Sequence, residues 1–326
     1  MRSSLDEFTK QIGDLTSLVA SILPVNTALA GHSDSVVRQY LLIRRRFDYA
    51  AFIVALYSSL ETFLENLVGE FAVVIAKQKP YSALPSKLTQ KHTIKSADLL
   101  ARGRLGEGRY IGVQPVDVVK NLYDCLTDAT PYALNQIAIV SHDLNLRSDE
   151  INALFKVIGI EQVCDLVRRV DSMLQWYIGA HALVESRPDS VPGATIEGRI
   201  DELVERRNQV AHRGGNPDDL LGPDGMLDMV AFIEAFSKSI FSVVVAKYLQ
   251  DYYLTPESAF ALKLREGPYK NGKVVVVDRP AQRLYVGQPA FVLVPPGARW
   301  GRILSLQLTT TKSILLIRRS WRLKSG

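Results

Sequence analysis

Cysteine is scarce in this chain of 326 residues: it occurs only as Cys125 and Cys164, far apart and each within an apolar helical pattern. This excludes a disulfide framework and a cysteine-rich zinc site, and a reducing cytoplasm is the expected location. The five histidines lack metal-ligand spacing, so neither a metal nor a cofactor is expected. The glycine-rich segments lack the Gly-Lys-Ser/Thr of a P-loop, and no Gly-x-Ser-x-Gly marks a serine hydrolase.

Apolar runs free of charge are also short. The most apolar stretch, residues 50–76, carries Glu61, Glu65, Asn66 and Glu70, and the N-terminus lacks the apolar segment of a secretory signal. We therefore expect a soluble protein with no membrane partner. With 47% hydrophobic and 22% charged residues, the chain can bury a large core and is not a disordered protein.

The net charge of +5 is unevenly distributed. Residues 255–326 contain 13 Lys and Arg against 3 Asp and Glu, which gives +10. The remaining 26 basic and 31 acidic residues give residues 1–254 a net charge of −5. Such asymmetry indicates a tail that binds a polyanion, attached to an acidic body.

Apolar residues recur at helical spacing through the first 254 residues, which predicts a mainly α body. The second pattern is unusually long, which suggests a kink or break at Gly69. The predicted helices cover residues 4–30, 36–77, 94–105, 115–125, 131–140, 148–159, 160–185, 196–212 and 226–252.

Beyond residue 254 the pattern changes to short β-branched runs with period-two alternation, separated by Gly and Pro turns. Four or five strands are expected, forming a small antiparallel sheet or a partly open barrel. The expected division is an N-terminal helix packed on the bundle (residues 1–33), a helical domain (34–254) and a basic β module (255–326).

The helix at residues 196–212 ends in a group of polar residues, Arg207, Asn208 and His212. At 100° per residue Asn208 lies about 40° from His212, and Arg207 lies about 140° from it, so a phosphate across this face could touch both ends. A simpler interpretation is that the basic last turn, with Arg206 and Arg213, complements the helix dipole. Both interpretations remain open from the residues alone.

Arg-Asn-x-x-x-His at the end of a helix in an all-α body resembles the signature of the HEPN superfamily of metal-independent ribonucleases. The segments "ALYSSLETFLENLV" and "SHDLNLRSDEINALFKVIGI" make the chain similar to the RiboL-PSP-type branch. The resemblance spans about residues 36–250 and does not include the basic β module. It implies a HEPN-type helical bundle.

The resemblance also implies an activity: an endoribonuclease that yields 2′,3′-cyclic phosphate and 5′-OH ends, acting as a toxin or anti-phage effector. His212 would serve as base or acid, Arg207 would hold the phosphate oxygens, and Asn208 would orient the imidazole or the phosphate. HEPN proteins form composite sites in homodimers, so a twofold dimer with the motif at its interface is expected, with an antitoxin or defence-system protein as a further partner. The alternative is an inert HEPN scaffold that binds RNA or a protein through its basic tail.

Two further groups of residues are candidates. Glu61, with Ser58 one turn earlier, lies in a largely apolar helix pattern, where it either pairs with Arg207 or His212 or is simply solvated. In the β module, basic residues interleave with Trp300 and Trp321, as suits single-stranded RNA, although both tryptophans could instead fill a small core. The candidate RNA-binding residues are Arg206, Arg213, Arg299, Arg302, Arg318, Arg319, Arg322 and Lys324.

Overall fold

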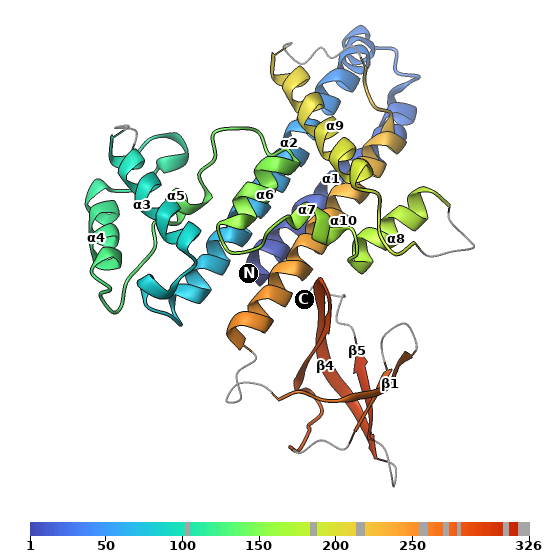
Figure 1. The fold of residues 1–326 in the computed structure, drawn as a ribbon. Coiled ribbons are helices and arrows are strands. Elements are labelled where there is room, and N and C mark those ends of the chain that lie inside the picture. The colour runs from blue at the N-terminus through green and yellow to red at the C-terminus, as the bar shows by residue number, and fades with distance from the viewer. Residues whose placement is uncertain are drawn as a thin grey trace. The chain divides into compact units, whose positions relative to one another are not determined.

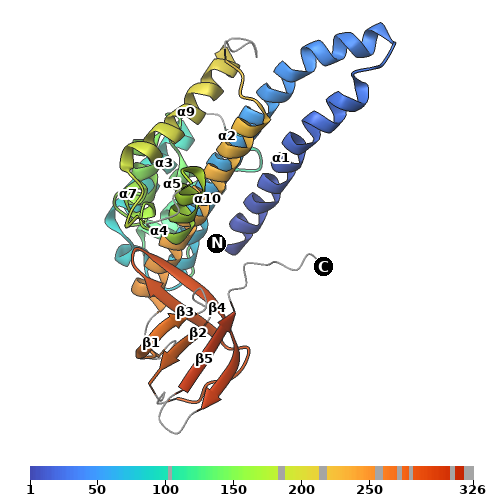
Figure 2. The same cartoon turned by 90° about the vertical axis from the view of Figure 1, so that its right-hand side faces the viewer.

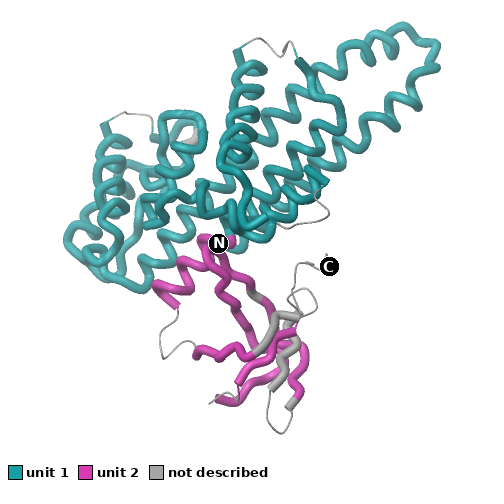
Figure 3. Tube along the Cα trace, turned by 45° about the vertical axis from the view of Figure 1, so that its right-hand side comes forward, with its two compact units in different colours: residues 1–241 teal, residues 242–326 magenta. Residues whose placement is uncertain are grey.

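The computed structural model describes the 326 residues except for several short segments. Those outside the described residues are 102–104, 183–187, 213–218, 254–259, 270–273, 279–281, 309–312 and 319–326, together with the side chains of 109, 266–269, 300, 308 and 313–318. The described chain forms two compact units, residues 1–241 and 242–326, which are considered separately (Figure 3).

The first unit is built from α-helices, as the periodicity predicts (Figure 1). The described helices are α1 (Arg2–Leu29), α2 (Ser35–Ala76), α3 (Ser86–Ala101), α4 (Pro115–Leu126), α5 (Gln136–Val140), α6 (Ser148–Lys156), α7 (Val163–Val167), α8 (Asp171–Ala180), α9 (Gly193–His212) and α10 (Pro223–Tyr248). A π-helical turn, Leu249–Tyr253, follows α10. The pattern predicted as one helix over residues 160–185 is divided between α7 and α8.

Helix α2 is the central element of this unit. Asp34 caps its first turn by accepting a hydrogen bond from the backbone N–H of Val36 at 2.7 Å, and the helix continues unbroken through Gly69 to Ala76. The expected break at Gly69 is therefore wrong. Helix α2 packs against α1, α5, α6 and α9, three of which lie far from it in the sequence.

Helices α1 and α2 form a long hairpin whose turn end projects away from α9 and α10 (Figure 2). Near its base, Phe8 packs on Phe63 with ring centroids 4.7 Å apart, and Ile12, Leu15 and Val19 continue the buried face of α1. Toward the turn, α2 exposes apolar side chains instead. The N-terminal helix thus packs on the bundle over its first half.

Three described helices are long and apolar enough to cross a membrane by length and composition alone: α1, α2 and the stretch from Pro223 to Tyr253. In the most apolar 18-residue window of each helix, the share of residues buried inside the fold is 78% for the last of these, 56% for α2 and 17% for α1. Core packing explains the apolar character of α10 and of much of α2. The absence of a membrane partner stays a prediction.

The second unit contains the predicted antiparallel sheet, with strand order β1-β2-β5-β4-β3. Val275, Val277 and Ile303 form its small core. The last turns of α10 belong to this unit: Ala246 and Leu249 pack on Ala298. The units therefore divide at residue 242, inside α10, whereas the sequence-based division lies after residue 254. The strands are β1 (Leu264–Tyr269), β2 (Val274–Val277), β3 (Pro289–Val294), β4 (Gly297–Leu308) and β5 (Ser313–Arg318).

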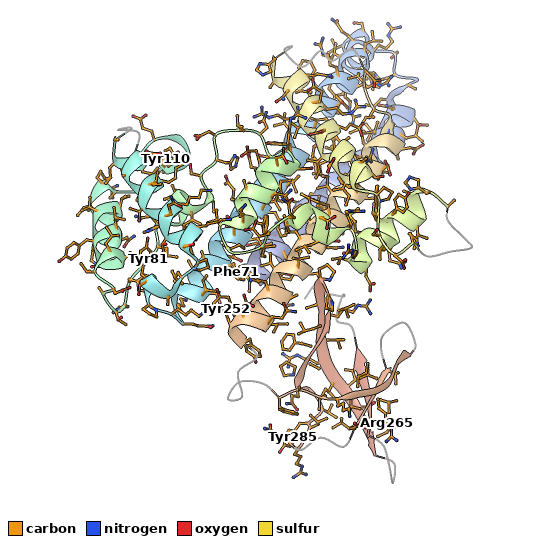
Figure 4. The ribbon with its side chains drawn as sticks, viewed as in Figure 1. Phe71, Tyr81, Tyr110, Tyr252, Arg265 and Tyr285 are labelled. Atoms are coloured by element: carbon orange, nitrogen blue, oxygen red, sulfur yellow. The ribbon has the colours of Figure 1, made fainter. Side chains whose placement is uncertain are left out.

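A buried histidine joins α3 to the segment that precedes α5. The Nε2 atom of His92 accepts a hydrogen bond from the backbone N–H of Asn135 at 2.9 Å, and its Nδ1 lies 3.0 Å from the hydroxyl of Tyr81. That hydroxyl in turn donates to the carbonyl of Thr89 at 3.0 Å, so the neutral imidazole donates from Nδ1. Burial lowers the pKa of His92 to about 4. Tyr81 is labelled in Figure 4.

This histidine should make the stability of the protein pH-dependent. Because the folded-state pKa is depressed, the unfolded chain takes up the proton first, so stability falls as the pH drops from 6.5 towards 4, by up to about 3 kcal/mol. Urea unfolding at several pH values measures this loss. A His92→Gln variant should be less stable at pH 7 and lose less stability between pH 6.5 and 5. Parallel curves for the two proteins would contradict the assignment.

Candidate active site on helices α2 and α9

Helix α9 carries the Arg-Asn-His motif, and its buried residues Ile196, Ile200, Leu203 and Val204 fix the orientation of the helix against the core. The guanidinium of Arg207 lies over the ring of Tyr57 on α2, 5.3 Å from its centroid. A cation over an aromatic face gains electrostatic attraction and keeps its N–H groups at the ring edge available to a ligand. Arg207 is thus held at a half-buried position while it retains donors for an anion.

Asn208 fixes the guanidinium of Arg207. Its Oδ1 accepts hydrogen bonds from Nη1 of Arg207 at 3.2 Å and from Nδ2 of Asn145 at 3.0 Å. The sequence-based role of Asn208 was to orient the imidazole or the phosphate. In the structure one hydrogen bond joins Asn208 to Arg207, the other joins it to Asn145, and neither involves His212.

His212 is the last residue of α9, and its side chain is exposed. No described residue makes a hydrogen bond to its imidazole. Arg213, the neighbouring candidate, and the Gly-Gly pair after it lie outside the described residues.

The segment between α5 and α6 joins the two helices of the site. The backbone N–H of Leu146 donates to the hydroxyl of Tyr57 at 3.1 Å, and that hydroxyl donates to Oε1 of Glu61 at 3.2 Å. Burial raises the pKa of Tyr57 to about 12, so the hydroxyl keeps its proton and can serve both contacts. Arg147 completes the join by pairing with Asp201 of α9 at 2.7 Å.

Glu61 has different partners from those expected. It contacts Tyr57 and lies 3.8 Å from Nε2 of His142, and no described contact joins it to Arg207 or His212. Of the two alternatives that the sequence left open for Glu61, direct pairing with Arg207 or His212 is not seen among the described contacts, and Tyr57 lies between Glu61 and Arg207. Ser58 is exposed, and no hydrogen bond of its side chain is seen among the described residues.

His142 anchors the joining segment to α2. Its Nε2 lies 3.0 Å from Oε1 of Glu65, and its Nδ1 lies 2.8 Å from the carbonyl oxygen of Leu144. With an oxygen close to each ring nitrogen the protonated form is favoured, and the adjacent carboxylate of Glu65 raises the pKa of His142 despite its burial. Sequence reasoning assigned this histidine no role, because its partner lies on a distant helix.

Arg206 is committed to the fold and not to RNA. Its side chain is 13% exposed and donates to Glu202 at 2.9 Å, to the hydroxyl of Tyr49 at 3.0 Å and to the backbone carbonyl of Asp219 at 3.2 Å. All its main donor directions are used inside the protein. Arg206 therefore links α9 to α2, one residue before the outward-facing Arg207. The structure corrects the expectation that Arg206 binds RNA, because its donors are already used inside the protein.

In the second unit, some of the basic candidates can be placed. Arg302 is exposed and donates to the carbonyl of Gly287 at 3.0 Å, whereas Arg299 is half-buried. Strand pairing sets Arg302 opposite the backbone of Arg318, but the Arg318 side chain lies outside the described residues. The same holds for all of Arg319, Arg322 and Lys324, for Trp321, and for the Trp300 side chain.

Aromatic groups that sequence reasoning missed lie in the same unit: Tyr285 in the segment before β3, and Phe291 on β3. Tyr285 is 58% exposed, with the guanidinium of Arg283 5.6 Å from its ring centroid. It projects from the sheet in Figure 4. Phe291 pairs in register with Trp300, so it shares the sheet face of Arg302. The interleaved basic and aromatic residues in the sequence indicated such a surface, but they did not show which aromatic side chains lie next to which basic ones.

Comparison with known families identifies the helical part of the chain. Residues 26–246 match the family model described as RiboL-PSP-HEPN, which covers well over half of the chain. The protein therefore belongs to the RiboL-PSP-type branch of the HEPN superfamily, whose helical domains are often ribonucleases, commonly bind RNA and often dimerise. Comparison with curated proteins and with solved structures gave no match.

The two adjacent arginines should behave differently when removed. Arg206→Ala loses three internal contacts of a charged group and should lower the free energy of unfolding by about 2 kcal/mol. Arg207→Ala loses one hydrogen bond and a cation–π contact and should cost about 1 kcal/mol or less. Urea unfolding of both variants measures the difference. A larger loss for Arg207→Ala would contradict the structural role given to Arg206.

Proposed function

We propose that this protein is a metal-independent endoribonuclease. The observation that carries the proposal is the guanidinium of Arg207, held over Tyr57 and fixed by Asn208 on the helix that ends in the exposed His212. A planar, permanently charged group with free donors, on the same helix as a histidine, suits phosphoryl chemistry on RNA. Membership of a superfamily that is often ribonucleolytic supports the same function.

The proposed reaction uses the RNA's own 2′-OH as nucleophile. The 2′ oxygen forms a bond to phosphorus while the bond from phosphorus to the 5′ oxygen breaks, which leaves a 2′,3′-cyclic phosphate and a 5′-OH. One group accepts the 2′-OH proton and another donates a proton to the leaving oxygen. Arg207 stabilises the extra negative charge on the non-bridging oxygens, and His212 supplies one of the two proton transfers.

A second copy of the chain would supply the other proton-transfer group. Along the first half of α2, apolar side chains recur at spacings of four, three, four and seven residues, and all are at least 45% exposed. Such 3-4 spacing is typical of helices that pair with one another. The stripe ends one turn before Tyr57, so a twofold contact through it would bring two motifs together. Its members are Val36, Tyr40, Ile43, Phe47 and Val54.

The β module would hold the RNA strand outside the reacting phosphate. The charge of +10 over residues 255–326 favours a polyanion, and exposed Tyr285 and Phe291 beside Arg283 and Arg302 offer stacking surfaces with adjacent cations. The RNA class is unspecified by these contacts, since phosphate pairing and stacking tolerate many sequences.

The cellular role follows from the chemistry and the family resemblance. An RNA-cleaving enzyme without a required cofactor is harmful unless it is restrained, which fits a toxin or anti-phage effector in the cytoplasm, held by an antitoxin or a defence-system protein. The competing function is an inert HEPN scaffold that binds RNA or a protein through the basic module. The full Arg-Asn-His motif supports the enzyme, because a scaffold does not need His212.

Cleavage in the presence of EDTA tests the activity. The wild type should cut RNA in EDTA to products with 2′,3′-cyclic phosphate ends, while Arg207→Ala and His212→Ala should lose at least about a hundredfold in rate, the magnitude usual for such groups. Glu197→Gln, an exposed change elsewhere on α9, is the matched control. Loss of activity in EDTA, or full activity of His212→Ala, would exclude the mechanism; binding without cleavage would favour the scaffold.

Two changes on the apolar stripe test the dimer. Ile43→Asp with Phe47→Asp should convert a dimer to a monomer in sedimentation experiments and lower cleavage at least about tenfold, because the second site half is lost. Leu42→Asp is the control, since Leu42 is 82% exposed but lies about 100° around the helix from Ile43. A dimer that survives the double change, or fails equally in the control, would place the interface elsewhere.

A further inference from the structure

A polar stripe on α2 runs from the motif to a cavity. Tyr57, Glu61, Glu65 and Gly69 are four residues apart, so each lies about 40° around the helix from the one before it and neighbouring members are adjacent on the surface. Arg207 lies over the first of them, and the others border a cavity of about 500 Å³. That volume is within the range of roughly 300–1,000 Å³ typical of small-molecule sites. The lining residues are Glu61, Glu65, Asn66, Gly69, Gln136, Ile137 and Val140.

Gly69 lets α5 approach α2 closely at the wall of this cavity. A glycine inside a helix is destabilising, so its place in the middle of a 42-residue helix calls for a local reason. A Cβ atom there would come within 3.3 Å of Oε1 of Gln136 and 3.7 Å of Cγ1 of Val140. The missing side chain therefore lets the amide of Gln136 lie directly against α2, at the wall of the cavity.

The lining groups suit a flat heterocycle better than a phosphate. Carboxylates repel phosphate and accept hydrogen bonds, while the carboxamides of Asn66 and Gln136 both donate and accept. Ile137 and Val140 supply apolar surface for a ring face. His142 lies 3.0 Å from Glu65 and offsets its charge, whereas the only described hydrogen bond to Glu61 goes to Oε1, which leaves Oε2 as an acceptor.

We propose that this cavity binds the base of the nucleotide whose phosphate lies at Arg207, and that it prefers guanine. The inference rests on the proposed function. Guanine presents two adjacent donors, N1–H and the N2 amino group, which match the two oxygens of one carboxylate. The corresponding edges of adenine, cytosine and uracil place an acceptor beside each donor. Glu61 reads the donors, and the neighbouring amides reach the acceptors on the same base.

The position of the cavity fits one nucleotide. Glu61 is one helical turn, about 5.4 Å along the axis, from the tyrosine beneath Arg207. A base in the cavity and its phosphate at the guanidinium would thus lie along the same face of α2. The two positions belong to the same helix, and Tyr57 donates a hydrogen bond of 3.2 Å to Glu61 between them.

Cleavage-site mapping tests the preference. On an unstructured RNA containing every dinucleotide step, the wild type should cut beside guanine about tenfold faster than beside adenine. Glu61→Gln should reduce this ratio to near one. Tyr57→Phe removes the hydroxyl but leaves the cavity, so it should slow both steps and keep the ratio. A ratio unchanged by Glu61→Gln, or one that collapses equally in Tyr57→Phe, would overturn the pocket.

A binding measurement separates the pocket from the catalysis. The full-length His212→Ala protein should bind guanosine 3′-monophosphate about tenfold more tightly than adenosine 3′-monophosphate in calorimetry, and Glu61→Gln should abolish the difference. Retained guanine preference in a protein that cuts no RNA would support the pocket while the proposed function fails. Cleavage without base preference and equal nucleotide binding would overturn the pocket alone. Binding of spermidine, lost in Glu61→Gln, without binding of either nucleotide would identify a cation site and also overturn it.

Discussion

The contact between the Arg207 guanidinium and the Tyr57 ring is the interaction on which the rest of the site depends. A cation at a half-buried position loses hydration, and the aromatic face replaces part of it without using up the N–H groups. The ring can serve only if it is fixed, and its hydroxyl is fixed by Leu146 on one side and Glu61 on the other. The orientation of α9 against α2 is thereby set by contacts that also determine which way the arginine faces.

The joining segment before α6 connects parts of the chain that lie far apart in sequence. Asn145 bonds to Asn208 across 63 residues, and Leu146 bonds to Tyr57 across 89. His142 and Arg147 add charged contacts to α2 and α9 at its two ends. Because an irregular segment has no hydrogen-bond ladder of its own, these side-chain contacts define its conformation, and a change in any of them is felt at the arginine.

Local periodicity was sufficient to predict the mainly α body, the antiparallel sheet and the placement of Arg207, Asn208 and His212 on one helix end. These features depend on residues within a few turns of one another. The tertiary partners of the site could not be predicted: Tyr57 and Asn145 carry no sequence signal that distinguishes them from core or loop residues. The division of residues 160–185 into α7 and α8 was also missed, because Val170 between them adopts an extended backbone, with ψ 138°, that only the packed structure reveals.

The structure also separates two arginines that the sequence presents as equivalents. Arg206 and Arg207 are about 100° apart around α9, so one turns toward Tyr49 and Glu202 while the other turns toward the Tyr57 ring.

The sheet of the second unit packs against the C-terminal end of α10, which belongs to the same unit. Ala246 and Leu249 pack on Ala298, and the Ser242 hydroxyl bonds both to the N–H and to the carbonyl of that residue. If the sheet were transferred to another protein, it would need this helix end to cover its apolar residues. The smallest segment that could fold as this module therefore begins inside a helix and not at a linker.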